Sequence, residues 1–96
     1  EVDLKSILVP GKITIVDFYA EWCGPCRDLG PKLEQFARGN PDVCLRKINI
    51  VNWGTPVVKQ YGIRSVPNVQ VYDKNGRKVG AMSGSQSICD LVSQAR

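Results

Sequence analysis

Two of the chain's four cysteines, Cys23 and Cys26, are separated by two residues and follow a strongly apolar run. At the first turn of a helix, cysteines with this spacing can close a small disulfide ring with little backbone movement. Free backbone N–H groups and the positive helix end favour the thiolate of Cys23, and the thiolate is the nucleophilic form. Cys26, one turn further in and more buried, can attack a mixed disulfide formed on Cys23. The pair therefore predicts thiol–disulfide exchange, with Pro25 stiffening the ring.

The apolar run before the two cysteines contains one charged residue, Asp17. A buried carboxylate without a partner is costly, so burial should raise the pKa of Asp17 and suit it to carry a proton near neutral pH. The alternative is that Asp17 only hydrogen-bonds to the backbone. The chain has no histidine, which excludes Ser-His-Asp and Cys-His catalysis and mixed Cys/His zinc sites. Asp17 is therefore the one buried candidate for proton transfer.

Length and composition limit what else the chain can be. Its 96 residues predict a single domain over residues 1–96. Lysine and arginine exceed aspartate and glutamate by four but are spread along the whole chain, which favours a solvated surface over a nucleic-acid site. No apolar run approaches the roughly 20 residues of a membrane span. Because the sequence starts at Glu1, we expect a processed or trimmed chain, with any signal segment out of view.

Hydrophobic periodicity and turn residues predict eight elements. The apolar run over residues 12–20 predicts a strand buried on both faces, and the cysteines begin a helix over 23–39 that contains Pro31. The other predicted helices and strands are a helix over 2–9, a strand over 43–50, a helix over 55–62 capped by Thr55, strands over 68–72 and 77–82 joined by a turn over 73–76, and a helix over 85–95.

This order of elements predicts the architecture. The opening strand–helix–strand unit favours a parallel pair with a right-handed crossover, and the closing hairpin adds antiparallel strands to the same sheet. Helices before, between and after the strands would cover both faces. The sequence therefore predicts one α/β domain around a four-stranded mixed sheet.

Two segments carry a resemblance to a known family. Residues 16–26 (VDFYAEWCGPC) resemble the active-site segment of thioredoxins, and residues 61–67 (YGIRSVP) resemble the family's second landmark. The similarity runs from residue 3 to about residue 92. It implies the thioredoxin fold, without the family's usual first strand.

The resemblance also implies roles for four residues. Cys23 would be the attacking cysteine and Cys26 the resolving one. Asp17 would be the buried acid beneath the disulfide, which exchanges a proton with the resolving thiol. Lys47 falls where the family keeps a lysine near that acid.

A second group of residues would contact the substrate. The resemblance implies that Pro67 is a cis-proline facing the disulfide, that Val66 pairs its backbone with the substrate, and that Trp22 flanks the disulfide. A glycine, either Gly84 or Gly80, would offer a smooth patch to the partner chain. The full set implied is Trp22, Gly24, Pro25, Val66, Pro67 and Gly84.

Three further residues are singled out without an assigned function. Cys44 and Cys89 lack a helix-start position, so we expect two buried free thiols, with a disulfide between them or a regulatory role as alternatives. Trp53 lies in a segment that departs from the family pattern, where it either plugs a surface groove or extends a partner-facing surface.

Together these features predict a thiol–disulfide oxidoreductase. The Gly24-Pro25 dipeptide resembles that of reducing members of the family. No cofactor motif is present, so electrons would come from a thioredoxin reductase or another dithiol donor and pass to disulfide-containing proteins. We expect a cytoplasmic monomer, or a periplasmic one after removal of a signal. A zinc module and a catalytically idle adaptor are the competing hypotheses, although zinc needs four ligands and one such pair supplies two.

Overall fold

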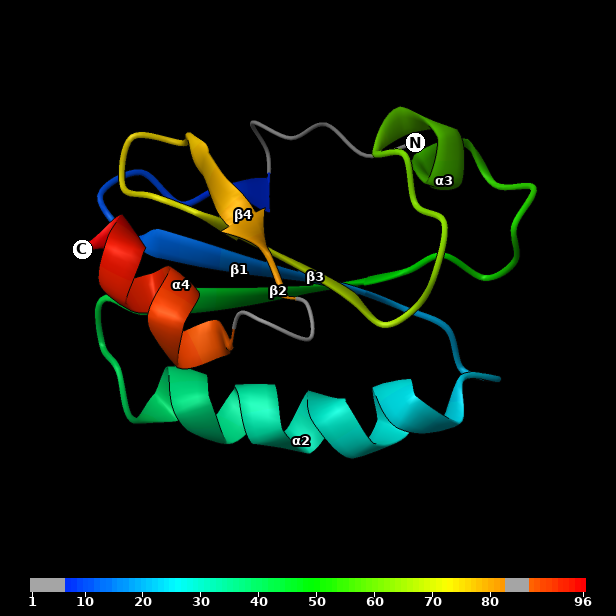
Figure 1. Ribbon diagram of the computed structural model, residues 1–96, viewed down its shortest axis with the longest axis horizontal. Helices are drawn as coiled ribbons and strands as arrows, with labels where there is room; N and C mark the ends of the chain where they lie inside the picture. Colours follow the sequence, from blue (N-terminus) through cyan, green and yellow to red (C-terminus); the bar gives the residue numbers. More distant parts are fainter. Residues whose placement is uncertain (1–6, 83–86) are drawn as a thin grey trace.

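The four strands of the sheet lie in the order β2-β1-β3-β4 in the computed structural model, which describes residues 7–82 and 87–96 (Figure 1). Strand β1 pairs in parallel with β2 and antiparallel with β3, and β3 pairs antiparallel with β4. The strand bounds are Ile13–Tyr19 for β1, Val43–Asn49 for β2, Asn68–Tyr72 for β3 and Lys78–Ala81 for β4. The predicted four-stranded mixed sheet is therefore confirmed.

Strand β1 occupies an interior position of the sheet, with a hydrogen-bonded neighbour on each side. Six of its seven residues are buried, as its almost continuous apolar sequence predicts for a strand covered on both faces. In the parallel register Asp17 of β1 lies opposite Lys47 of β2. This pairing brings the two ionisable residues of the predicted site together.

Helices cover both faces of the sheet, and the sheet separates the core into two clusters. On one face, Ile13 and Ile15 of β1 pack in a cluster with Leu33 of α2 (Gly24–Arg38) and Leu91 of α4 (Ile88–Ala95). On the other face, β1 contributes to a second cluster that contains Val57 of α3 (Pro56–Gln60) and both Cys23 and Cys26. Figure 1 shows α2 and α4 on one side of the sheet and α3 on the other.

The predicted element bounds differ most from the structure at the start of α4 and at the end of α3, which ends at Gln60 and not at residue 62. Helix α4 begins at Ile88, three residues after the predicted start at Ser85, because Ser87 accepts a hydrogen bond from the backbone N–H of Asp90 and forms a capping box. Thr55 precedes α3 as predicted but makes no capping bond; its hydroxyl donates instead to the carbonyl oxygen of Ile50 at 2.7 Å. Most of the helix predicted over residues 2–9 lies outside the described residues.

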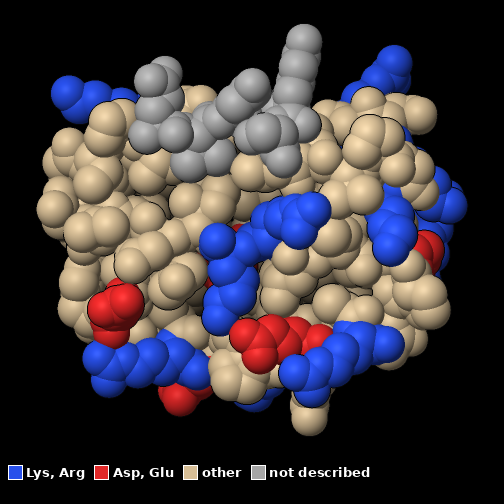
Figure 2. Space-filling view, turned by 180° about the vertical axis from the view of Figure 1, so that it is seen from behind, with Lys and Arg blue, Asp and Glu red and all other residues tan. Residues whose placement is uncertain are grey.

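Charged side chains on one face of the molecule are shown in Figure 2. Basic and acidic groups are interspersed there and form no continuous basic stripe. This arrangement agrees with the solvated, mildly basic surface expected from the net charge. No helix within residues 7–82 and 87–96 has the length and apolar character needed to cross a membrane.

Candidate active site

The junction between β1 and α2 holds the two cysteines. Cys23 is the N-cap residue of α2, and its sulfur accepts a hydrogen bond from the backbone N–H of Cys26 at 3.2 Å. The two sulfurs form a disulfide, with 5.3 Å between the Cα atoms. The expected difference in burial is not present, because Cys23 and Cys26 are 6% and 5% exposed. Both sulfurs lie in the core cluster beside α3, and the helix start directs a backbone donor at Cys23.

Gly24 and Pro25 form the outer side of the disulfide ring. Both residues are exposed, and proline occupies the start of α2, where its missing N–H costs no hydrogen bond. The start of the helix is also tied to the preceding turn, because the guanidinium of Arg27 donates to the carbonyl oxygen of Glu21 at 2.9 and 2.6 Å. The ring is thus presented outward on a well-anchored helix end.

Asp17 lies in the middle of β1 and is 1% exposed. Its Oδ1 atom has no hydrogen-bond partner among the described residues. Burial raises the pKa of Asp17 to about 6; the positive charge of Lys47 opposes this rise, and the negative charge of Glu34 adds to it. A carboxyl group with this pKa can take up and release a proton near neutral pH.

The ammonium group of Lys47 binds a residue that the sequence did not single out. It lies 3.1 Å from Oε1 of Glu34 on α2 and 5.3 Å from the centre of the Tyr19 ring. A Cβ atom at Gly30 would lie 3.5 Å from the Lys47 nitrogen, so the small residue leaves that side of the helix open to the lysine. Glu34 follows Gly30 by one helical turn, but only the packing of α2 on β2 identifies it as the partner of Lys47.

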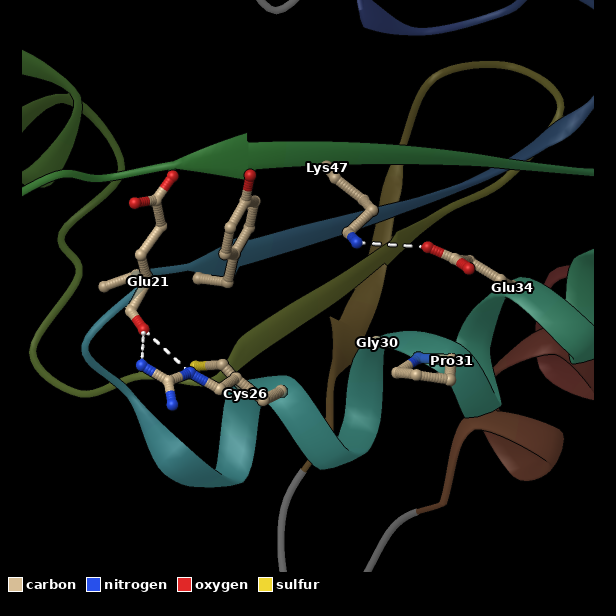
Figure 3. A pocket seen from close by; sticks show the side chains of 9 residues that line it. Glu21, Cys26, Gly30, Pro31, Glu34 and Lys47 are labelled. Carbon is tan, nitrogen blue, oxygen red and sulfur yellow. Dashed lines mark hydrogen bonds and ion pairs between the residues drawn. The ribbon is translucent and has the colours of Figure 1, made fainter.

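A pocket of about 420 Å³ lies between the Lys47–Glu34 pair and Cys26. Cys26, Gly30 and Glu34 line it from α2, and Lys47 lines it from β2. Figure 3 shows the side chains of Lys47 and Glu34 pointing toward one another from opposite walls. The pocket gives solvent access to Cys26 from the side on which the Lys47–Glu34 pair lies.

The second landmark segment contributes to the same core cluster as the cysteines. The peptide bond between Val66 and Pro67 is cis, as the resemblance implied, and Val66 packs against the core cluster that contains both cysteines. Of the two candidate glycines, Gly84 falls outside the described residues. Gly80 lies on β4, opposite Val71 of β3.

Trp22, Val51 and Trp53 form a surface cluster beside Cys23, here called the apolar patch. Trp22 and Trp53 are 51% and 46% exposed, with ring centres 5.8 Å apart. The indole N–H of Trp22 donates to the carbonyl oxygen of Val51 at 2.7 Å. Trp53 is therefore a surface residue in contact with Trp22, and Val51 is a residue of this area that sequence reasoning passed over.

The other two cysteines are free but are not buried as expected. Cys44 on β2 is half-buried and Cys89 on α4 is exposed. Cys89 lies on the outer side of a helix whose buried residues are Leu91 and Val92. The expectation that both cysteines are buried as small apolar side chains is therefore wrong for Cys89.

The sequence model of the thioredoxin family matches residues 4–96. The chain belongs to the thioredoxin family. Together with the Cys23–Cys26 disulfide, this membership identifies a thiol–disulfide oxidoreductase.

Individual thioredoxins match over most of the chain. The chain is 42% identical over 95 residues to a thioredoxin of Alicyclobacillus acidocaldarius, covering 98% of this chain and 89% of the relative. It is 49% identical over 71 residues to a probable thioredoxin-2 of Caenorhabditis elegans, covering 73% of this chain. The match spans 48% of that nematode relative.

Solved thioredoxin structures share the fold. The thioredoxin of Fasciola hepatica superposes with a TM-score of 0.74 at 28% identity, covering 91% of this chain and 84% of the other. Thioredoxin f from spinach chloroplast gives a TM-score of 0.79 at 26% identity, with 99% and 84% coverage. The thioredoxin fold expected from the sequence is therefore confirmed.

Proposed function

We propose that this thioredoxin-family chain reduces disulfide bonds in proteins, with Cys23 as the attacking and Cys26 as the resolving cysteine. The observation that carries the proposal is the position of Cys23 at the N-cap of α2, where its sulfur accepts the backbone N–H of Cys26. A hydrogen bond to sulfur and the positive helix end both favour a thiolate over a thiol. Residues 1–96 act in this proposal as one domain, which the family match over residues 4–96 supports.

The proposed reaction moves two electrons from the protein to the substrate. The Cys23 thiolate attacks one sulfur of the substrate disulfide, the substrate S–S bond breaks, and the other substrate sulfur leaves as a thiolate that takes up a proton. The Cys26 thiol then loses its proton and attacks the Cys23 sulfur, which releases the second substrate thiolate. The protein ends as the Cys23–Cys26 disulfide, and a dithiol electron donor must reduce it again.

Asp17 is proposed to accept the proton of Cys26 through water; the support is its buried place on β1, opposite Lys47, which lines the same pocket as Cys26. Its pKa of about 6 leaves it mostly ionised at pH 7, so that it can take up a proton and return it. Lys47 is proposed to limit the rise of this pKa. Replacement of Asp17 by asparagine should slow resolution of the mixed disulfide by at least about tenfold, and an unchanged rate would make Asp17 structural only.

Substrate contact is assigned in the proposal to the surface around the disulfide ring. Its support is that Trp22, Gly24 and Pro25 are exposed next to the cysteines in the chain, and that Val66 packs against the core cluster that contains both cysteines. We further propose that the protein acts as a monomer and receives electrons from a thioredoxin reductase. The proposed compartment is the cytoplasm or, alternatively, the periplasm. The monomer is tested by sedimentation of the reduced protein.

The roles of the two cysteines are tested by trapping. With a disulfide-containing protein such as insulin, the Cys26→Ser variant should accumulate a mixed disulfide through Cys23, and the Cys23→Ser variant should not. Preferential alkylation of Cys26 in the reduced protein at mildly acidic pH would reverse the assignment. The direction of electron flow is tested by equilibration with glutathione, and a potential more oxidising than about −150 mV would contradict a reductant.

A further inference from the structure

The apolar patch contains the large hydrophobic side chains that are exposed within residues 7–82 and 87–96. Trp22 is 51%, Val51 57% and Trp53 46% exposed, and no other large hydrophobic side chain of these ranges is as open to solvent. They come from two parts of the chain, the turn before α2 and the loop between β2 and α3. Scattered exposed apolar residues are normal on proteins, whereas contiguous ones mark interaction sites.

The loop that supplies Val51 and Trp53 is held in place by hydrogen bonds. The backbone N–H of Val51 donates to Oδ1 of Asn49 at 2.9 Å, and its carbonyl oxygen accepts the indole N–H of Trp22 at 2.7 Å. Farther along, the N–H of Gly54 donates to Oδ1 of Asn52 at 2.8 Å. Hydrogen bonds therefore hold the loop before and after Trp53, and one of them joins the loop to Trp22.

Val51 adopts a backbone conformation that its side chain disfavours. Its φ is 68°, in the left-handed region that β-branched residues rarely enter. A strained backbone persists where the surrounding structure enforces it, and such positions gather at functional sites. The conformation leaves the Val51 side chain exposed next to Trp22, where it adds nothing to either core cluster.

The patch is continuous with the position at which a substrate sulfur must arrive. Trp22 directly precedes Cys23 in the chain, so the patch is within reach of a polypeptide joined to Cys23 in a mixed disulfide. The three patch side chains carry no charge, and tryptophan provides large, rigid contact area at low entropic cost. Three side chains provide far less contact area than the roughly 800 Å² that each partner buries in a stable protein interface. The patch suits a transient contact with a short peptide segment, and is too small for a stable dimer.

We propose that the apolar patch binds a hydrophobic or aromatic side chain of the substrate polypeptide close to the cysteine under attack, with Trp53 as the specificity-determining residue. This inference rests on the proposed function, because it needs Cys23 to be the attacking cysteine. Bound in this way, the side chain holds the substrate while the disulfides exchange. Substrates with such a residue beside their cysteine are therefore preferred over those without one.

The test uses two disulfide-bridged peptides that differ only in the residue beside each cysteine, phenylalanine in one and serine in the other. Pre-reduced protein is mixed with excess peptide, quenched in acid and separated by chromatography, which gives a half-saturation concentration and a maximum rate. The wild-type protein should half-saturate at about tenfold lower concentration of the phenylalanine peptide, the effect expected of one aromatic anchor. Trp53→Ala should remove most of this preference and leave the maximum rate within about twofold.

Two matched variants and a small substrate complete the design. Trp53→Phe keeps an aromatic ring and should retain most of the preference, whereas Lys59→Ala, an exposed residue of α3 outside the patch, should behave as wild type. Hydroxyethyl disulfide has no side chain for the patch, so wild type and Trp53→Ala should reduce it equally fast. Circular dichroism of each variant checks that the fold is intact.

Three results would overturn the inference about the patch. These are a wild-type protein that reduces both peptides equally well, a Trp53→Ala variant slowed equally on both peptides and hydroxyethyl disulfide, and a concentration-dependent dimer that the Trp53→Ala substitution abolishes. The last result would assign the patch to a second copy of the chain. A wild-type protein that reduces neither peptide would instead refute the proposed function, and the substrate preference with it.

Discussion

At the scale of single residues, Asp17 is the most costly side chain of the site. Its carboxyl group lies in the middle of a buried strand, and its Oδ1 atom has no hydrogen-bond partner among the described residues. Lys47, which lies opposite Asp17, forms an ion pair with Glu34 instead. Burial disfavours the charged form, which is why the pKa of Asp17 rises. A buried group that lowers stability, on the strand that leads into the two cysteines, is better explained by chemistry than by packing.

The raised pKa of Asp17 makes stability depend on pH. Its pKa is about 6 in the folded protein against an ordinary value of 3.8, so the folded state binds the proton more tightly. Stability should therefore fall as pH rises from about 4 to about 6 and stay lower above that range. Relative to wild type, Asp17→Asn should be more stable at pH 7 by on the order of 2 kcal/mol, with little difference at pH 4.

Denaturant unfolding of the oxidised protein at pH 4 and pH 7 measures this effect. The comparison is between the wild-type and Asp17→Asn free energies of unfolding at each pH. A difference that is the same at both values, or larger at pH 4, would contradict the raised pKa.

Glu34 should control the pKa of Asp17 through Lys47. In Glu34→Gln the carboxylate that holds the ammonium at 3.1 Å is gone, so Lys47 is free to approach Asp17. Loss of the negative charge also removes a cause of the raised pKa. Both effects should lower the pKa of Asp17, which carbon NMR titration of its carboxyl group in the oxidised protein measures.

Because Glu34 is expected to act on the pKa of Asp17 through Lys47, substitutions at Lys47 serve as the control. Lys47→Met should raise the pKa of Asp17, and adding Glu34→Gln to it should produce a smaller decrease than in the wild-type background. Asp28→Asn removes another exposed carboxylate of α2 that does not line the pocket, and it should change the pKa of Asp17 less. Equal effects of the Asp28 and Glu34 substitutions would mean that the net charge of the protein, and not the ion pair with Lys47, changes the pKa of Asp17.

At the scale of elements, the strand–helix junction was predictable and the following loop was not. The apolar run and the Gly24-Pro25 start predicted β1 and α2 to within one residue, because local pattern and helix-start chemistry agree there. The left-handed Val51 and its contact with Trp22 depend on residues brought together only by the tertiary fold. The pairing of Lys47 with Glu34 was missed for the same reason, since it joins a strand to a helix.

Gly30 offers a test of how α2 is built. A glycine inside a helix is less favourable than alanine, and a Cβ atom at this position would make only an ordinary 3.5 Å contact with Lys47. Gly30→Ala should therefore raise the free energy of unfolding by about 0.5 to 1 kcal/mol, as measured with denaturant.

Gly62 is the matched control for this substitution. Its φ is +63°, where an alanine side chain is strained, so Gly62→Ala should lower stability by about 1 kcal/mol. A Gly30→Ala variant as unstable as Gly62→Ala would show that the helix cannot accept a side chain beside Lys47.

At the scale of the whole molecule, the four cysteines occupy three environments. Cys23 and Cys26 are joined at the end of β1, Cys44 is half-buried on β2, and Cys89 is exposed on α4. The sequence correctly separated the pair from the other two by spacing alone. It could not predict the exposure of Cys89, because only Leu91 and Val92 of the eight-residue helix are buried, and so narrow a buried stripe leaves the burial of its neighbours undecided.

Thiol labelling of the oxidised protein should therefore show two rates. Cys89 should react first with iodoacetamide and Cys44 much more slowly, because access to the thiol limits the reaction of a half-buried cysteine. Mass spectrometry of the modified peptides measures both rates, and Cys89→Ser should abolish the fast phase. Equal rates at the two positions would contradict the described packing of β2.

The loop over residues 51–54 also matters for protein engineering. It joins β2 to α3, and none of its residues belongs to either core cluster. The cysteines, Asp17 and Lys47 lie on β1, α2 and β2 or at their ends. The Trp22–Val51 hydrogen bond ties the backbone of the loop to the reactive centre, so a library of side chains at position 53, which leaves that bond in place, can retarget the same redox chemistry.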